Sequence, residues 1–384
     1  MTATDVKPPA FVRTAPMDAL PPPAAMTGAL GWVRANLLAG PLNIALTVVF
    51  ILLIVWVVPP LVKFLVIDAT WSGADREACL ASEARPEAGA CWAFVRERLP
   101  YFIYGSYPIP ERWRVDVFFA MLALGIGWLL WLGAPRRDLG ALYFFVVLPI
   151  VSVVLLKGWA LVGLAPVDTA LWGGALVTIV VATVGIVVSL PVGILLALGR
   201  RSRMPAVKLF SVIYIEFVRG VPLITVLFMA SVMLPLFVPD AWSPDKLLRA
   251  LVGIAMFASA YMAEVVRAGL QAIPKGQFEG AMAVGLNYRQ MMRLVVLPQA
   301  LKITIPNIVN TYIGLFKDTT LVSIVGMFDL LRTIESARID PKWATPVTSA
   351  TGYAVAAVFY FVFCYGMSRY ARYTEARLAR GDRR

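Results

Sequence analysis

The stretch LWGGALVTIVVATVGIVVSLPVGILLALG, at residues 171–199, contains no charged side chain and decides the class of fold. About twenty apolar residues are enough for one helix to cross the hydrocarbon core of a bilayer, so this run can cross it with a tilt. Similar runs predict seven more membrane helices, at about 43–66, 117–133, 139–156, 210–238, 250–272, 303–328 and 352–370. We therefore predict an all-α integral membrane protein with about eight transmembrane helices.

Composition supports this class and excludes several others. The chain is 60% hydrophobic and only 15% charged, whereas soluble proteins carry about 25% charged residues. Its net charge is +12, but the basic residues lie between apolar runs and form no basic face, so we expect no nucleic-acid partner. The chain has no histidine and no CxxC pair, so we predict no catalytic site, metal site or bound cofactor.

The basic residues predict the orientation of the chain. They follow the second, fourth and sixth runs, at 136–137, 200–208 and 289–302, and the last run, at 369–384. Positively charged loops stay in the cytoplasm, so both termini and the loop at 273–300 are expected there, with membrane lipid around the helices.

Three regions follow from these patterns. Residues 1–40 form a Pro/Ala-rich cytoplasmic tail with a short surface helix near 30–38. Residues 41–165 form a three-helix extension with an outside loop at 68–114, and residues 166–384 form the working domain. Cys79 and Cys91 lie in the outside loop, where an oxidising compartment favours a disulfide over two free thiols.

The cytoplasmic loop reads FEGAMAVGLNYRQMMRLVVLP at residues 278–298. We predict a helix at 275–284, a break at Gly285 and a second helix that runs to Pro298, because glycine turns without a Cβ penalty. The spacing resembles the EAA loop of ABC-importer permeases, with Gly280 where alanine is usual and Val295 where isoleucine is usual. The positions that correspond to the motif, and that the resemblance assigns to coupling with the ATPase, are Glu279, Gly280, Ala281, Gly285, Leu297 and Pro298.

Two further segments resemble polar amino-acid permeases of the histidine/glutamine type. They are YIEFVRGVPL at 214–223 and FKDTTL at 316–321. The resemblance implies a type I, MetI-like core of five helices that carries polar or general L-amino acids across a bacterial inner membrane by alternating access. Residues 104–110, YGSYPIP, make the N-terminal part similar to the M-type subunit of general L-amino-acid transporters.

The resemblance also implies partners. The chain has no G-x-x-x-x-G-K-[ST] sequence, so ATP and Mg are expected on a separate ABC ATPase that meets the loop around Gly285. A periplasmic amino-acid-binding protein would deliver the substrate. A second homologous permease subunit, or a second copy of this chain, would complete the pathway.

Ionisable residues inside apolar runs are candidates for the substrate pathway, because burying a charge in a membrane is costly. Glu216 and Arg219 share a helical face and precede a break at Gly220–Pro222, where unpaired N–H groups favour a carboxylate. Lys317 and Asp318, with Thr319, form the second set. Both sets can serve the two charged ends of an amino acid, or can pair internally and only stabilise the bundle.

Three other readings compete with the importer. A secondary transporter or channel without an ATPase fits hydropathy alone, but it has no need for a docking loop. A membrane enzyme would need clustered acids, bases or metal ligands, which the sequence lacks. A scaffold without transport activity would have little use for charges inside its membrane helices.

Overall fold

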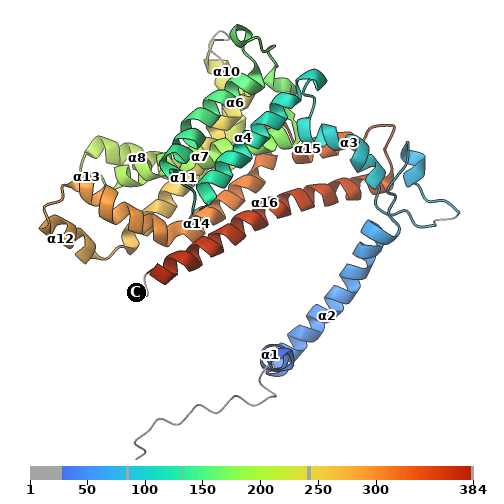
Figure 1. The fold of residues 1–384 in the computed structure, drawn as a ribbon, viewed down its shortest axis with the longest axis horizontal. Helices are drawn as coiled ribbons and strands as arrows, with labels where there is room; N and C mark the ends of the chain where they lie inside the picture. The colour runs from blue at the N-terminus through green and yellow to red at the C-terminus, as the bar shows by residue number, and fades with distance from the viewer. Residues whose placement is uncertain (1–27, 84–85, 132, 240–243, 382–384) are drawn as a thin grey trace, which may run out of the picture. The chain divides into compact units, whose positions relative to one another are not determined.

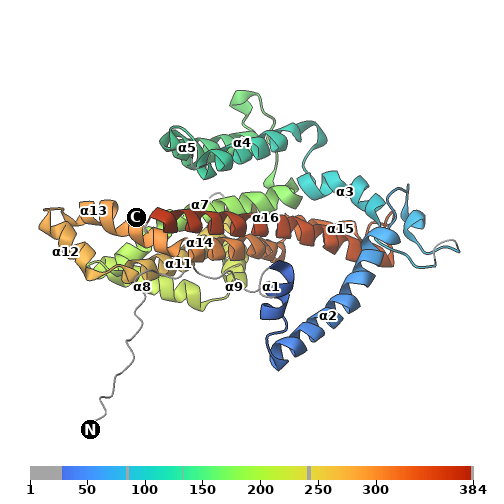
Figure 2. The same ribbon diagram turned by 60° about the horizontal axis from the view of Figure 1, so that its bottom comes forward.

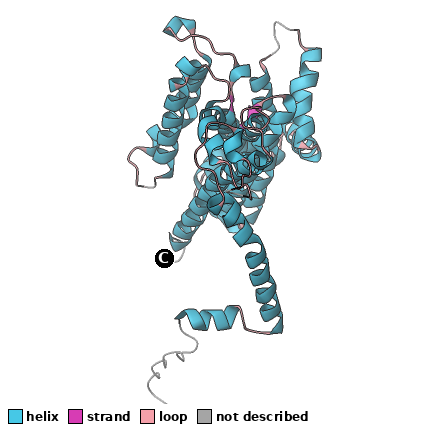
Figure 3. Ribbon diagram, turned by 90° about the vertical axis from the view of Figure 1, so that its right-hand side faces the viewer, coloured by secondary structure: helices cyan, strands magenta, loops and turns pink. Residues whose placement is uncertain are grey.

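The computed structural model describes residues 28–83, 86–131, 133–239 and 244–381, and helices make up almost all of it (Figure 3). The chain divides into two compact units, Met1–Ile67 and Asp68–Arg384. The boundaries expected at 40/41 and 165/166 stay predictions. Within the second unit, the second and third expected helices pack on the fourth. Most of the expected tail, residues 1–27, lies outside the described residues.

The described part of the first unit, residues 28–67, contains two α-helices. α1 spans Gly28–Asn36, where a short surface helix is expected, and α2 spans Pro41–Val62. A π-helical stretch at Lys63–Ile67 extends α2 into an apolar span of 27 residues. Each residue of α2 is exposed or half-exposed, as a helix surrounded by lipid requires.

The second unit contains the remaining elements (Figure 1). Its helices are α3 Trp92–Tyr104, α4 Trp113–Leu130, α5 Arg137–Leu142, α6 Leu148–Lys157, α7 Gly174–Arg200, α8 Pro205–Gly220, α9 Leu223–Phe228, α10 Leu234–Phe237, α11 Lys246–Ala272, α12 Lys275–Ala283, α13 Tyr288–Met291, α14 Leu297–Asp318, α15 Leu330–Ala337 and α16 Pro346–Gly381, and a short strand, β1, covers Phe328–Asp329. The π-helical stretches Tyr143–Val147, Met229–Met233 and Met292–Val296 join α5 to α6, α9 to α10 and α13 to α14.

Seven helices of the described chain are long and apolar enough to cross a membrane, and a bent pair makes an eighth. The bent pair, Pro205–Gly220 and Leu223–Phe237, turns by 105° at its break. A single straight helix at 210–238 is therefore wrong, whereas the break expected near Gly220 is present. Pro222 causes it, because proline lacks an N–H and keeps Val221 extended, at φ −105° and ψ 134°.

The helix predicted to stop at Pro298 continues into the membrane as α14, which corrects the expected start of the span at 303. The π-helical stretch Met292–Val296 explains the continuation. Within it, the Leu297 N–H donates to the Met292 carbonyl, five residues back. This wider turn lets the helix continue past Pro298, although proline has no N–H to donate. After α14 the chain tightens into a 3₁₀ helix, Thr319–Val325, so the regular helix ends before the predicted limit at 328.

α7 and α11 lie at the centre of the second unit (Figures 1 and 2). Small residues allow the close packing there, as is usual between membrane helices. A Cβ on Gly193 would lie 2.8 Å from the Met262 side chain, and one on Gly185 would lie 2.9 Å from Leu315. α4 and α6 pack on the outer side of α7 through Phe118 and the leucines of α6.

The ends of the second unit differ in character. α12 and α13 lie at one end, and α3 and α15 lie at the other (Figure 2). In the expected outside loop, Cys79 and Cys91 form a disulfide with a Cα–Cα separation of 5.5 Å. This loop is more ordered than a connection, because it contains α3, whose Phe94 packs on Trp343 and α15.

Candidate functional site

The loop between α12 and α14 is a helical hairpin with a defined turn. Gly285 has a φ of +78°, a conformation that favours glycine over other residues. Its N–H donates to the Met282 carbonyl at 2.9 Å, and the Leu286 N–H donates to the Ala281 carbonyl at 3.1 Å. This pair of bonds is a Schellman motif, which satisfies the last carbonyls of α12. The break predicted at Gly285 is therefore present.

The hairpin is braced on both sides of the turn. Asn287 and Gln290 form a reciprocal capping box at the start of α13. The Gln299 amide on α14 donates to Gln277 on α12 at 2.9 Å. The Arg201 guanidinium lies 5.8 Å from the centre of the Phe278 ring, a cation–π distance. The Gln299–Gln277 bond holds the two arms together, and the Arg201–Phe278 contact joins the hairpin to the end of α7.

The tip of the hairpin is exposed. Glu279 and Gly280 lie on its surface, and neither Gly280 nor Gly285 has a neighbour within 4 Å of an added Cβ. Met282 and Val284 are 58% and 74% exposed beside them. Ala281, by contrast, is buried under the hairpin in the cluster that includes Met291 and Val296. An exposed apolar surface on a rigid support is suited to docking another protein.

Leu297 and Pro298 lie away from this tip. They form the first turn of α14, where Leu297 is half-buried and Pro298 is exposed. They therefore support the inner arm of the hairpin and contribute nothing to its tip.

A cluster of five charged side chains lies between α7, α8 and α11. Glu264 is its centre: the Glu264 carboxylate pairs with Arg267 on the same helix, with Arg219 of α8 at 3.6 Å and with Arg200 of α7 at 3.8 Å. The Glu264, Arg200 and Arg267 side chains are only 25–27% exposed. Three arginines and two glutamates leave one surplus positive charge.

Glu216 and Arg219 belong to this cluster, but they do not pair with each other. Glu216 pairs with Arg200 at 2.7 Å, and Arg219 points to Glu264 and to the face of Tyr261, 5.5 Å away. Packing of α8 against both α7 and α11 supplies these nearer partners. The Arg219 Nε is buried and has no hydrogen-bond acceptor in the described structure, so it remains available as a donor.

Sequence reasoning missed Glu264 and Arg267 and read Arg200 only as a topology signal. A signal existed: Glu264 and Arg267 are three residues apart within the apolar run at 250–272. Glu216 and Arg219 show the same spacing of an acidic and a basic residue inside an apolar run, so this pattern marks both helices.

Lys317, Asp318 and Thr319 lie elsewhere. Lys317 is exposed, Asp318 is half-buried, and the buried Thr319 hydroxyl donates to the Phe316 carbonyl at 2.8 Å. Among the described residues, no ion pair within 4 Å joins Lys317 to Asp318 or either to the cluster around Glu264. An α-helix rises about 1.5 Å per residue. Glu264 therefore lies roughly 12 Å along α11 from the end that adjoins the hairpin, and Lys317 lies roughly 30 Å along α14 from the end that adjoins the hairpin.

The described residues contain no group of three or more Cys, Asp or Glu side chains that could hold a metal ion. The described geometry is that of a bundle of apolar helices with an exposed helical hairpin at one end and two separate sets of charged side chains.

Comparison with known proteins identifies the class. Residues 189–380 match the family described as "Binding-protein-dependent transport system inner membrane component", and the chain belongs to this family. It is therefore a membrane component of a binding-protein-dependent transport system, as the loop motif predicts.

Individual relatives match most of the chain. It is 48% identical over 353 residues to the inner membrane amino-acid ABC transporter permease protein YhdY of Escherichia coli K12, covering 92% of this chain and 94% of the relative. It is 41% identical to the glutamate/glutamine/aspartate/asparagine transport system permease protein BztC of Rhodobacter capsulatus, covering 97% and 99%. A shorter relative, the probable glutamine ABC transporter permease protein GlnP of Bacillus subtilis, is 31% identical over 54% of this chain and 93% of its own.

Proposed function

We propose that this chain is the transmembrane subunit of an ATP-driven importer of polar amino acids in a bacterial inner membrane. ATP and Mg bind to a separate ABC ATPase, and a periplasmic binding protein delivers the substrate. A second permease subunit, homologous or identical, forms the other half of the pathway. The relatives named amino-acid permeases support the substrate class.

The hairpin around Gly285 carries this proposal. A secondary carrier has no need for a braced helical pair with an exposed apolar tip. An ATPase that changes shape needs such a pair, because only a rigid element can pass a movement into the membrane helices. The hairpin also supports the orientation that we propose. The end of α16 lies on the same side of the second unit as α12 and α13 (Figure 2), so the hairpin and the C-terminus face the cytoplasm.

The charge cluster around Glu264 suits a zwitterionic substrate. The surplus positive charge and the free Nε–H of Arg219 can take the substrate carboxylate, while Glu216, whose side chain is 55% exposed, can take its ammonium group. Lys317, Asp318 and Thr319 form a second set nearer the outer face. Alternating access would pass an amino acid from the outer set to the inner cluster.

A pull-down tests the coupling role. The detergent-solubilised chain is isolated from its own membranes as wild type, Gly285→Asp and Gly276→Asp. We expect an ATP-hydrolysing subunit to accompany the wild type and Gly276→Asp, and to be lost or reduced with Gly285→Asp. Gly276 is the matched control because it lies in the same hairpin, in open space and in the first turn of a helix, where Asp is favourable.

Either of two outcomes would overturn the proposal. Absence of any ATPase with the wild-type chain under mild conditions would make a secondary transporter the better account. Equal recovery with all three chains would show that Gly285 lies outside the docking surface.

Transport assays test the substrate residues separately. Glu216→Gln and Arg219→Gln are expected to slow amino-acid uptake in proteoliposomes while the ATPase stays bound. Unchanged uptake by either variant at equal expression would remove that residue from the pathway. The same substitutions at Lys317 and Asp318 test the outer set.

A further inference from the structure

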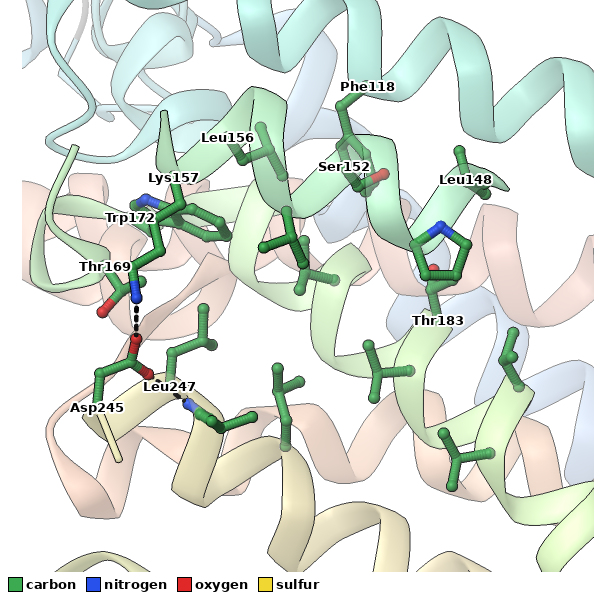
Figure 4. A pocket seen from close by; sticks show the side chains of 18 of the residues that line it. Phe118, Leu148, Ser152, Leu156, Lys157, Thr169, Trp172, Thr183, Asp245 and Leu247 are labelled. Atoms are coloured by element: carbon green, nitrogen blue, oxygen red, sulfur yellow. Dashed lines mark hydrogen bonds and ion pairs between the residues drawn. The ribbon is translucent and has the colours of Figure 1, made fainter. Parts of the chain in front are cut away.

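A pocket of about 330 Å³ lies between the extension helices and the core (Figure 4). Its walls are mostly apolar and come from α4, α6, α7 and α11, with Phe118, Leu148 and Val184 as examples. Ligand pockets in proteins occupy about 300–1,000 Å³. The space is therefore sufficient for a slender apolar group, and its position against membrane-spanning helices makes lipid the nearest source of one.

The pocket extends along one half of the membrane. Its lining on α6 runs from Leu148 to Lys157, roughly 14 Å of helix, and its lining on α7 runs from Val180 to Val188, roughly 12 Å. Half of the hydrocarbon core of a bilayer is about 15 Å thick. Lys157 ends its helix on the side away from the coupling hairpin, so the pocket matches the depth of the outer leaflet in the orientation proposed above.

One end of the pocket carries a positive and a negative group. The Lys157 Nζ lies 3.2 Å from the Asp245 Oδ2, and the two side chains are 55% and 31% exposed. The other Asp245 oxygen accepts the Leu248 N–H and caps α11, which fixes the position of the carboxylate. At the level of lipid head groups, this pair complements a phosphate beside an ammonium group.

Two polar groups inside the charged end lack partners in the described structure. Trp172 lines the pocket and is only 6% exposed, yet its indole N–H has no acceptor. The Ser152 Oγ on the opposite wall is also buried without a partner. An unmet donor in an apolar setting is costly, and a lipid ester carbonyl is an acceptor that lies at this depth.

We propose that this pocket binds a phospholipid of the outer leaflet with a zwitterionic, primary-ammonium head group of the phosphatidylethanolamine type. One acyl chain lies between α6 and α7. The phosphate pairs with Lys157, the ammonium group pairs with Asp245, and an ester carbonyl accepts the Trp172 N–H. The bound lipid would join the extension helices to the transport core.

Photolabelling tests the proposal. The full chain with its native partner subunits is reconstituted in bilayers that contain phosphatidylethanolamine with a diazirine in one acyl chain. After irradiation, labelled peptides are identified by mass. We expect labelling of residues 148–157 and 180–188 to exceed that around Leu195 by about tenfold, which corresponds to about 1.4 kcal/mol of preference. Leu195 is the reference because it is 68% exposed on the same helix and outside the pocket.

Two variants with matched controls distinguish binding of the lipid acyl chain from binding of the lipid head group. Val184→Trp fills the pocket and is expected to abolish the excess labelling, whereas Leu195→Trp adds the same side chain to the same helix and leaves it unchanged. Lys157→Gln is expected to lower the labelling about tenfold. Lys246→Gln removes a charge on the same side of the membrane, outside the pocket, and serves as its control.

The result can overturn the proposal in three ways. Equal labelling at the pocket and at Leu195 in the wild type would show that no lipid is held there. Labelling that appears only after the partner subunits are removed would show that a protein helix covers the pocket. Equal labelling by a phosphatidylglycerol analogue, which offers Asp245 no ammonium group, would refute the head-group assignment.

Discussion

Replacing Gly285 by alanine should loosen the hairpin at residues 275–299, which we propose couples the chain to an ATPase, without unfolding the helical bundle. Gly285 has a φ of +78°, and an L-residue with a Cβ pays roughly 1–2 kcal/mol in this left-handed region. The added Cβ meets nothing within 4 Å, so steric repulsion adds nothing to this cost. A change of that size shifts a local opening equilibrium by roughly 5–30-fold.

Amide hydrogen exchange measures this opening directly. The Gly285 and Leu286 N–H groups form the two bonds of the turn, and they exchange only when it opens. We expect exchange at residue 285 and Leu286 to speed up roughly 5–30-fold in Gly285→Ala, while amides in α11 keep their protection. ATPase recovery in the pull-down should fall in parallel.

Two variants make the test specific to backbone conformation. Gly285→Asn should behave nearly like the wild type, because asparagine tolerates the left-handed region better than alanine does. Gly280→Ala adds the same methyl group to the same hairpin, also in open space but inside a helix, and should slow exchange slightly or leave it unchanged. Equal exchange in Gly285→Ala and Gly280→Ala would refute the reasoning.

Three further predictions concern other parts of the second unit. Glu264→Gln leaves Arg219 and Arg267 without their charged partner and should cost about 1–3 kcal/mol in thermal unfolding in detergent, whereas Glu335→Gln, in a surface pair, should cost less than about 1 kcal/mol. Cys79→Ser should speed proteolysis of the outside loop, with a loss of about 2–4 kcal/mol, and Cys364→Ser, at the free cysteine, should not. Burial raises the pKa of Asp329 to about 6, so its contribution to stability is present below the unfolded pKa of about 4 and is lost as the pH rises through 6. Between pH 4 and pH 7, wild-type stability should therefore fall by about 2 kcal/mol relative to Asp329→Asn, which still caps α15.

The membrane spans could be predicted from the sequence because their cause is local. A run of twenty apolar residues must form a helix in a bilayer, whatever surrounds it. The break in the fifth span was equally visible, since Pro222 removes a donor and restricts the residue before it. The angle of 105° between the two halves was not visible, because it depends on how α8 packs against α7 and α11.

The continuation of the helix through Pro298 shows the limit of a local rule. Proline ends most helices, and from this rule a helix end at Pro298 is expected. In the structure, Leu297 bonds to a carbonyl five residues back and the helix passes the proline. A π-helical turn of this kind has no sequence signature, since its cost is met by packing of Met291, Met292 and Val296 under the hairpin.

The partners of the buried charges were also beyond local reasoning. Glu216 and Arg219 are neighbours on one helical face, and a pair between them satisfies every local rule. The structure gives each a better partner from another helix, Arg200 for Glu216 and Glu264 for Arg219. Sequence spacing can therefore locate a charge in the membrane, but tertiary packing decides which charge it meets.

The position of the cluster explains how the hairpin can influence it. α11 carries Glu264 and is joined to α12 by only Ile273 and Pro274. A second connection lies beside it: Arg200 contacts Glu264, while the next residue, Arg201, donates to the Leu270 carbonyl and stacks on Phe278 of the hairpin. A displacement of α12 relative to α7 must therefore strain the contact between Arg201 and Phe278. Because Arg201 is the neighbour of Arg200 in the chain, we expect such a movement to reach the charge cluster that we propose for the substrate pathway.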